Sequence, residues 1–261
     1  MSGKVMVSVA GGVAVLAFNR PASLNALDAE MILAFREHCE ALSADASVRC
    51  VVLRGEGKAF LAGGDVAFFH GCLDQLPATV LRLARELHLG VLALRRMPKP
   101  VVASVHGAVA GAGVSLMAAC DLIVAADDCR FTLAYSRIGA SPDGGGTYFL
   151  ARSIGQRKAM ELALLSEPLD AATALRIGLV TRVVPAAHLQ EETLQLARRL
   201  AEGPTVAFAE TKRLLELSIA NSLESQLEAE AQAFARCAAT EDMREGVRAF
   251  VAKRKAQFKG R

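Results

Sequence analysis

Runs of apolar residues along the chain mark strands and helices in a regular order. Two short runs rich in valine, 5–10 (VMVSVA) and 13–18 (VAVLAF), are separated by two glycines. Glycine pairs between such runs are typical of a tight β-hairpin. In 28–44 the apolar positions recur at helical spacing, and an aspartate at the start can cap the helix. The sequence therefore begins with a predicted hairpin and helix.

Farther along, apolar strand-like runs alternate with helical patterns, and glycine-rich turns join them. We expect strands at 50–55, 100–107, 121–126 and 179–184, and helices at 73–96 and 113–120. This order predicts an α/β fold in which loops at the strand ends carry the chemistry.

The pattern becomes helical in the last quarter of the chain. Gly203-Pro204 is a strong break, and three helical patterns rich in Ala, Glu, Lys and Arg follow it at 205–220, 223–239 and 241–255. We predict a core formed by residues 1–203 and a helical region formed by 204–261. A helical appendage of this kind often packs on a neighbouring subunit.

Composition narrows the class of protein. Of the 261 residues, 52% are hydrophobic and 22% charged, which favours a large core over disorder. The net charge of +3, two tyrosines and no tryptophan argue against a nucleic-acid partner. The start of the chain lacks the pattern of a secretory signal, and no uninterrupted apolar run reaches the ~20 residues of a membrane helix. We therefore expect a soluble cytoplasmic protein with no membrane partner.

The cysteines and histidines give no metal pattern. The six cysteines form no CxxC pair, and we expect most of them to be reduced core residues. The five histidines are scattered, without metal-ligand spacing on one element, and we expect surface or core roles for them. We predict neither a metal nor a cofactor.

Two glycine-rich stretches suggest a site for a developing anion. The segment GAVAGAGVSL (107–116) fits neither a dinucleotide fingerprint, because Leu116 replaces its third glycine, nor a serine-hydrolase elbow, because Met117 replaces its last. Its glycines open a helix after a strand, which either directs backbone N–H groups into a cleft or allows close helix–strand packing. The loop KAFLAGGDV (58–66) offers a second N–H donor, and two converging donors make an oxyanion hole.

A third stretch, SPDGGGT (141–147), places Asp143 before three glycines. The aspartate can act as a helix N-cap or can move a proton. Three glycines make a poor first helical turn, since each costs up to ~1 kcal/mol of helix propensity relative to alanine. A chain tolerates this more readily where a ligand comes close.

Taken together, these stretches resemble the crotonase, or enoyl-CoA hydratase/isomerase, superfamily. The similar segments are FNRPASLNAL (18–27), KAFLAGGDV, the run from Lys99 to Ala126, SPDGGGTYFLARSIG and EGVRAFVAKRKAQF (245–258). The resemblance implies a crotonase-like spiral of ββα units followed by a C-terminal helical trimerisation region. It also implies a homotrimer or hexamer and a small-molecule acyl-CoA substrate, a CoA thioester.

Position-by-position matching to the family's motifs implies site residues. The two N–H donors around the thioester oxygen fall at Ala62 and Ala112, and the second is usually glycine in the family. The same matching implies substrate-binding positions along the CoA and acyl path at Lys58, Ala59, Gly64, Asp65, Val66 and Tyr135, and in the C-terminal helix at Phe250 and Lys253. The last two are expected to reach a CoA, including that of a neighbouring subunit. Phe68, Phe69, Leu73 and Leu76 suit either an apolar acyl pocket or ordinary core packing.

The sequence departs from the family's hydratases at their two water-activating glutamates. Ser115 and Tyr135 stand at those positions, and Asp143 is the carboxylate left at a family catalytic position. Isomerases resembling those of phenylacetate degradation carry an acid there. We therefore predict an enoyl-CoA isomerase with Asp143 as general base. Two alternatives remain: an enoyl-CoA hydratase, and a non-catalytic acyl-CoA-binding member of the fold.

Overall fold

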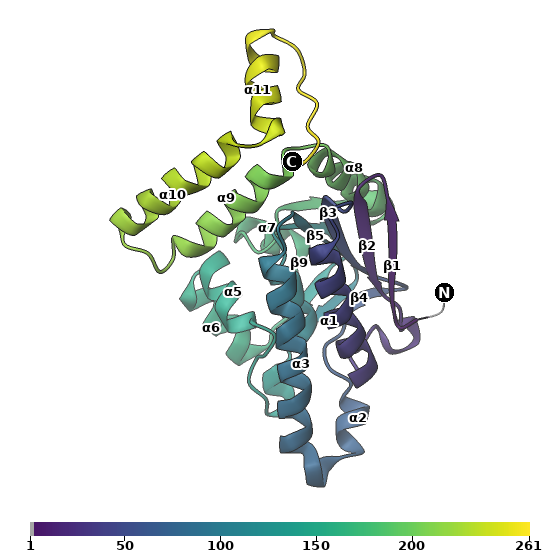
Figure 1. Cartoon of the computed structure of the whole chain (residues 1–261). Helices are drawn as coiled ribbons and strands as arrows, with labels where there is room; N and C mark the ends of the chain where they lie inside the picture. Colours follow the sequence, from purple (N-terminus) through teal and green to yellow (C-terminus); the bar gives the residue numbers. More distant parts are fainter. Residues whose placement is uncertain (1–2) are drawn as a thin grey trace.

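The computed structural model describes residues 3–261, and its centre is a six-stranded sheet (Figure 1). The strand order is β1-β2-β3-β5-β7-β10. The strands are β1 (Val5–Ala10), β2 (Val13–Phe18), β3 (Cys50–Gly55), β5 (Val101–Val105), β7 (Leu122–Ala126) and β10 (Arg182–Val184). β1 and β2 form the predicted antiparallel hairpin, and both turn glycines have positive φ. The remaining neighbours pair in parallel.

A second, smaller sheet has the order β4-β6-β8-β9. Its strands are β4 (Ala59–Leu61), β6 (Ala108–Ala110), β8 (Arg130–Thr132) and β9 (Leu169–Asp170). Each of the first three follows a strand of the main sheet within a few residues. Strands this short, bordered by glycines, have too few residues to show a period of two. For that reason the apolar pattern did not predict them, and the loop expected at 58–66 contains β4.

Helices complete the repeating unit. The small-sheet strands β4, β6 and β8 lead to helices α3 (Leu76–Arg96), α4 (Ala112–Ala118) and α5 (Gly146–Ser153), respectively. The expected spiral of ββα units is confirmed. The other helices up to residue 201 are α1 (Ala29–Ala44), α2 (Val66–His70), α6 (Gln156–Leu165), α7 (Ala171–Arg176) and α8 (Leu189–Ala201).

Most predicted boundaries agree with the structure to within three residues. Asp28 caps α1, because its Oδ1 accepts the Met31 N–H at 2.9 Å. The helix expected from residue 73 begins at Leu76, since Leu73–Gln75 is a 3₁₀ turn. The strand expected at 179–184 is reduced to its last three residues.

Three C-terminal helices form an arm beside this core. They are α9 (Thr205–Leu217), α10 (Leu223–Ala238) and α11 (Glu241–Val251). In Figure 1, α9 and α10 lie side by side and α11 extends away from the spiral. The Lys212 ammonium of α9 binds the Asp121 carboxylate at 2.8 Å, which fixes the arm to the start of β7. The helical region expected after Gly203-Pro204 is present, and its separation as a domain stays a prediction.

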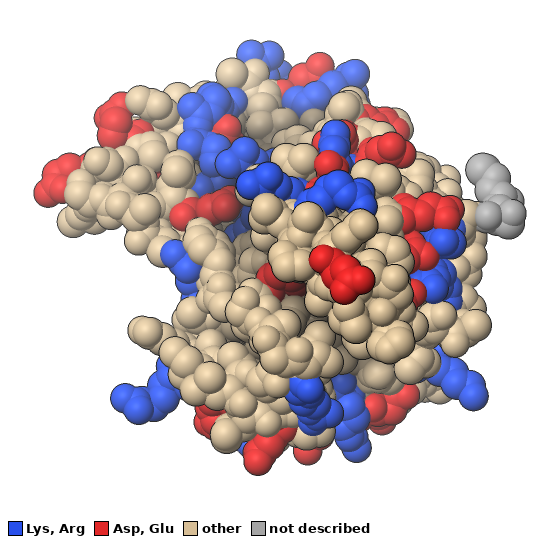
Figure 2. Space-filling view, turned by 90° about the horizontal axis from the view of Figure 1, so that it is seen from below, with Lys and Arg blue, Asp and Glu red and all other residues tan. Residues whose placement is uncertain are grey.

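Charged side chains of both signs are interspersed on one face of the molecule. Figure 2 shows acidic and basic groups scattered between wide areas of other residues on the face seen from below. None of the helices between residues 3 and 261 is both long enough and apolar enough to cross a membrane.

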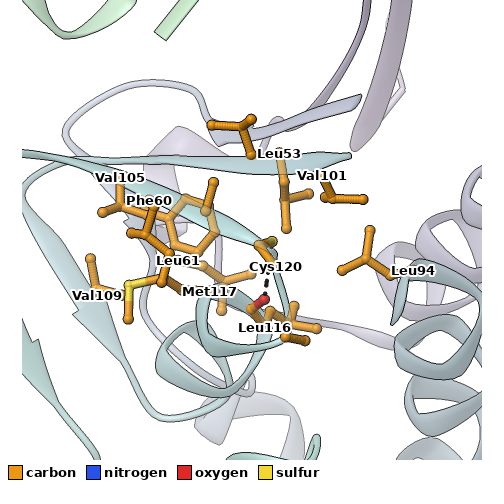
Figure 3. Packing of buried hydrophobic residues seen from close by; sticks show 14 of the residues in the cluster. Leu53, Phe60, Leu61, Leu94, Val101, Val105, Val109, Leu116, Met117 and Cys120 are labelled. Atoms are coloured by element: carbon orange, nitrogen blue, oxygen red, sulfur yellow. Dashed lines mark hydrogen bonds between the residues drawn. The ribbon is translucent and has the colours of Figure 1, made fainter. Parts of the chain in front are cut away.

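The core forms where the two sheets and the helices meet. Strand residues alternate between faces, so one face of the main sheet packs on α1 and the other on α8. Phe18 stacks edge-on against Phe60 of β4, with ring centroids 6.0 Å apart. Figure 3 shows Leu61 and Met117 packed beside Phe60 of β4 and Val109 of β6. This packing places the ends of β4 and β6 close together.

The cysteines are free, as expected. Cys39, Cys50, Cys120 and Cys129 are buried, and the Cys120 thiol donates to the Leu116 carbonyl (Figure 3). Burial raises the pKa of the Cys50 thiol to about 12, which keeps it neutral and unreactive.

Candidate active site

The two glycine-rich loops meet where β4 and β6 end. A Cβ on Gly111 would lie 3.3 Å from the Cα of Gly63, so the two backbones are in contact. A Cβ on Gly113 would overlap the Leu61 carbonyl oxygen. Gly113 therefore serves close helix–strand packing, one of the two readings of this stretch. The same packing brings the start of α4 against the loop after β4.

Ala112 has the geometry of an N–H donor. It is the first residue of α4, where the helix supplies no acceptor for the backbone N–H. Gly111, the N-cap, has φ 51° and turns the chain sharply into the helix. Ala112 is a buried residue, so its side chain presents little surface to a ligand.

Ala62 does not have this geometry, and the expectation for it needs correction. Its N–H donates to the Leu24 carbonyl at 3.0 Å and is therefore engaged within the protein. Gly64 lies two residues farther on. On either side of it, the Gly63 carbonyl accepts the Leu27 N–H and the Asp65 N–H donates to the Leu27 carbonyl. In an extended segment alternate groups point to opposite sides, so the Gly64 N–H faces away from Leu27. Gly64 is the better first donor. Motif matching missed this because hydrogen bonding to the distant segment 24–27 decides which N–H is free.

Asp143 is not a helix cap. Helix α5 begins at Gly146 with Gly145 as N-cap, and no side chain caps it. The Asp143 side chain is half-buried and accepts the Tyr135 hydroxyl at Oδ1, 2.6 Å away. Of the two roles open to this residue in the sequence, capping is excluded.

Backbone conformation and contacts within the protein both favour glycine at the three positions after Asp143. Gly144 and Gly145 have φ of 59° and 80°, a region that favours glycine. A Cβ on Gly146 would lie 2.5 Å from the Ser115 Oγ of α4. The sequence suggested that a ligand comes close to these glycines. In the structure, part of that space is taken by α4.

Two hydroxyls accompany the Asp143 carboxylate. Tyr135 lies in the 3₁₀ turn Tyr135–Ile138, and the Ser115 Oγ of α4 lies 3.4 Å from its Oη. Burial, and then the charge of Asp143, raise the pKa of the Tyr135 phenol well above its usual range. Tyr135 is therefore a neutral donor and not a base.

A histidine that the sequence pattern did not select also contacts this loop. The Nε2 atom of His88 on α3 accepts the Gly144 N–H at 3.2 Å. The two residues are 56 positions apart, and His88 lies inside an ordinary helical pattern. No local signal identifies it. The site thus brings together Ser115, Tyr135, Asp143 and His88.

The other expected substrate-binding residues lie at the start of β4 and in the segment that leads from it into α2, and their contact with a CoA stays a prediction. Lys58 is exposed and Ala59 buried, at the start of β4. Asp65 caps α2 through the Phe68 N–H and pairs with Arg20 at 3.0 Å, so its carboxylate is engaged in structure. Val66 is exposed beside it.

The apolar side chains that follow the first glycine-rich loop lie in two different environments. A Cβ on Gly64 would lie 3.2 Å from the Phe69 ring, which places that ring beside the first loop. Phe68 and Leu73 are exposed, which excludes ordinary core packing for these two residues.

Phe250 and Lys253 are not brought to the carboxylate within one chain. They lie on and just after α11, which extends away from the spiral (Figure 1). Phe250 is 86% exposed. Their expected contact with a CoA stays a prediction.

A cavity of ≈ 740 Å³ lies elsewhere, between the hairpin, β3 and α8. None of the four residues of the site lines it. Its Arg54 and Glu56 side chains are paired with each other. The cavity is therefore separate from the carboxylate and the glycine loops.

Comparison with known proteins agrees with the fold. Residues 8–261 match the family model for enoyl-CoA hydratase/isomerase. The chain is 36% identical to the 1,2-epoxyphenylacetyl-CoA isomerase of Escherichia coli over 98% of both chains. It is 35% identical to the 2,3-dehydroadipyl-CoA hydratase of the same organism over 99% of both. The crystal structure of an enoyl-CoA hydratase from Polaromonas superimposes with a TM-score of 0.94 at 35% identity, covering 98% of this chain and 100% of that one. The chain belongs to the enoyl-CoA hydratase/isomerase family.

Proposed function

We propose that this protein is an enoyl-CoA isomerase that moves the double bond of a 3-enoyl-CoA, or of a ring-containing acyl-CoA, through an enolate. One observation carries the proposal. Of the four side chains that meet at the site, Asp143 alone is a carboxylate, and it is not used as a helix cap. One carboxylate suffices to carry a proton from C2 to C4 of the substrate.

The backbone supplies the second requirement, stabilisation of the enolate. A thioester α-proton is too weakly acidic for a free carboxylate to remove. The Gly64 and Ala112 N–H groups are the proposed donors to the thioester oxygen, at the junction of the two glycine loops. The loss of one donor in such a site costs roughly 3–4 kcal/mol of barrier in a studied hydrolase. Asp143 takes the proton from C2 and returns it at C4, so the reaction changes no oxidation state and needs no cofactor.

The hydratase alternative is weaker on the same geometry. Water addition requires a second group to orient the water, and Ser115 and Tyr135 occupy the positions of the family's glutamates. Tyr135 donates to Asp143 and holds its own proton, so it does not supply a second base. The relatives include both an isomerase and a hydratase by name, and family membership alone leaves the choice open. A non-catalytic binding protein would bind CoA esters without turnover.

A panel of 2-enoyl-, 3-enoyl- and ring-containing CoA esters separates the three functions. We expect double-bond migration in a 3-enoyl or ring-containing ester to be the fastest reaction. Hydration of 2-enoyl esters as the main activity would support the hydratase. Binding of every ester without turnover would support the third alternative.

Asp143→Asn then tests the assigned base. Asparagine keeps the size and a hydrogen-bond acceptor for Tyr135 but cannot take the proton. We expect isomerisation to fall by at least ~100-fold, the low end for general base catalysis, with CoA-ester binding retained in calorimetry. Because Asp143 is not a cap, the melting temperature should stay near that of the wild type. Turnover close to wild type would assign the proton transfer to another group.

A further inference from the structure

The hydroxyls at the site form a hydrogen-bond chain with a defined direction. The Tyr135 hydroxyl has one proton and donates it to Asp143 Oδ1 at 2.6 Å. The contact of 3.4 Å between Ser115 Oγ and Tyr135 Oη must therefore be donated by the serine. The chain runs from Ser115 through Tyr135 to the carboxylate.

This chain of hydrogen bonds engages only one carboxylate oxygen of Asp143. Within residues 3–261 the Oδ2 atom accepts no hydrogen bond, while the Asp143 backbone carbonyl accepts the Gly146 N–H at 3.0 Å. The carboxylate is therefore held at one oxygen and has an open acceptor at the other.

The backbone around Tyr135 is held firmly enough to orient the phenol. The residue before the turn, Ala134, and the residue after it, Gly139, both adopt left-handed conformations. The Tyr135 carbonyl accepts the Ala140 N–H at 3.0 Å. The ring packs against the buried core, so its hydroxyl has little freedom to turn away from Asp143.

We propose that Tyr135 is a positioning residue that holds Asp143 Oδ1 and so presents Oδ2 to the substrate as the proton acceptor. The proposal rests on the proposed role of Asp143 as base, and it replaces the substrate-binding role expected for Tyr135. The proton removed from C2 passes to Oδ2 and then to C4. Tyr135 keeps its own proton throughout.

Few other titratable groups face this loop. From α3, His88 accepts the Gly144 N–H, and Arg95 lies over the Phe149 ring at 5.9 Å. From α4 the contact is Ser115, which does not titrate. A loss of rate caused by a Tyr135 substitution and absent from the control variant is therefore assigned to the carboxylate that Tyr135 contacts.

The test is Tyr135→Phe, with Tyr148→Phe as the matched control. Tyr148 is the other tyrosine of the chain, on the exposed side of α5. We expect Tyr135→Phe to lower the plateau kcat for isomerisation by roughly 10- to 100-fold through loss of orientation. KM should stay near that of the wild type, because loss of an interaction that acts only on the orientation of the base lowers kcat and kcat/KM together. Tyr148→Phe should change neither quantity.

The outcomes distinguish this inference from the proposed function. If Asp143→Asn abolishes turnover but Tyr135→Phe leaves the plateau kcat unchanged, the positioning role is wrong and the base assignment stands. If Asp143→Asn keeps near wild-type turnover, the proposed function fails first. Calorimetric binding of a CoA ester by Tyr135→Phe separates a lost rate from a lost fold, since an unfolded variant would not bind.

Discussion

At some positions of this site, contacts within the protein leave room only for glycine. Gly113 lies where β4 crosses the start of α4, and any side chain there would overlap the Leu61 carbonyl. Helix propensity alone favours alanine at this position by up to ~1 kcal/mol. The overlap is with backbone that cannot rotate away, so the steric cost exceeds the gain in propensity.

We therefore predict that Gly113→Ala destabilises the protein by about 1–3 kcal/mol, the usual cost of overpacking a core. Urea unfolding measures the change. Gly71→Ala is the control, because its nearest atom, the Phe68 carbonyl oxygen, lies at an ordinary 3.4 Å. Equal unfolding midpoints for Gly113→Ala and the wild type would show that the two loops can separate without cost.

Helices of the C-terminal arm are joined by a charged contact. The Glu210 carboxylate of α9 accepts Nε of Arg236 on α10 at 2.7 Å and Nη2 at 2.9 Å. The Arg236 guanidinium, together with Arg213, lowers the pKa of Glu210 to about 2. Because this pKa lies below that of a free glutamate, the stabilisation is present above about pH 4.5 and is lost as the pH falls toward 2.

Glu210→Gln should therefore be less stable than the wild type at pH 7, by less than about 1 kcal/mol because water screens the half-exposed arginine. The difference should narrow as the pH falls below about 4.5. Urea midpoints at pH 7, 4 and 3 follow it. A difference that stays constant over this range would assign it to packing of the side chain and not to its charge.

At the scale of the whole molecule, the C-terminal arm exposes more apolar surface than is usual for a monomeric protein. Leu223, Leu227 and Phe234 are exposed on α10 at spacings of four and seven residues, which places them on one face. Phe234 is 67% exposed. A face of this kind fits the expected packing against another copy of the chain.

We predict a trimer or a hexamer by light scattering at micromolar concentration. Phe234→Ser should lower the assembled fraction, because it removes the largest apolar side chain of the face. Leu33→Ser on α1, where the leucine is 41% exposed, is the control and should assemble as the wild type does. A monomeric wild type contradicts the prediction.

Local sequence determined the elements whose signals lie within a few residues. The glycine pair specifies the hairpin turn, and Asp28 caps the helix that begins beside it. Apolar spacing determined the long helices and buried strands, because periodicity reports which face is covered. The three-residue strands of the second sheet escaped the pattern, and motif resemblance supplied the ββα order instead.

Only the tertiary structure decided which groups are free to act. The Ala62 N–H is taken by Leu24, whereas that of Gly64 is turned away from its neighbours. Asp143 binds Tyr135, Tyr135 contacts Ser115 20 residues away, and His88 contacts the loop from 56 residues away. Propensity and spacing act over one or two turns of chain, whereas a hydrogen-bond partner is set by how distant elements pack. The sequence could thus name Asp143 as the acid, but the fold alone freed it from a helix end and placed it beside a phenol.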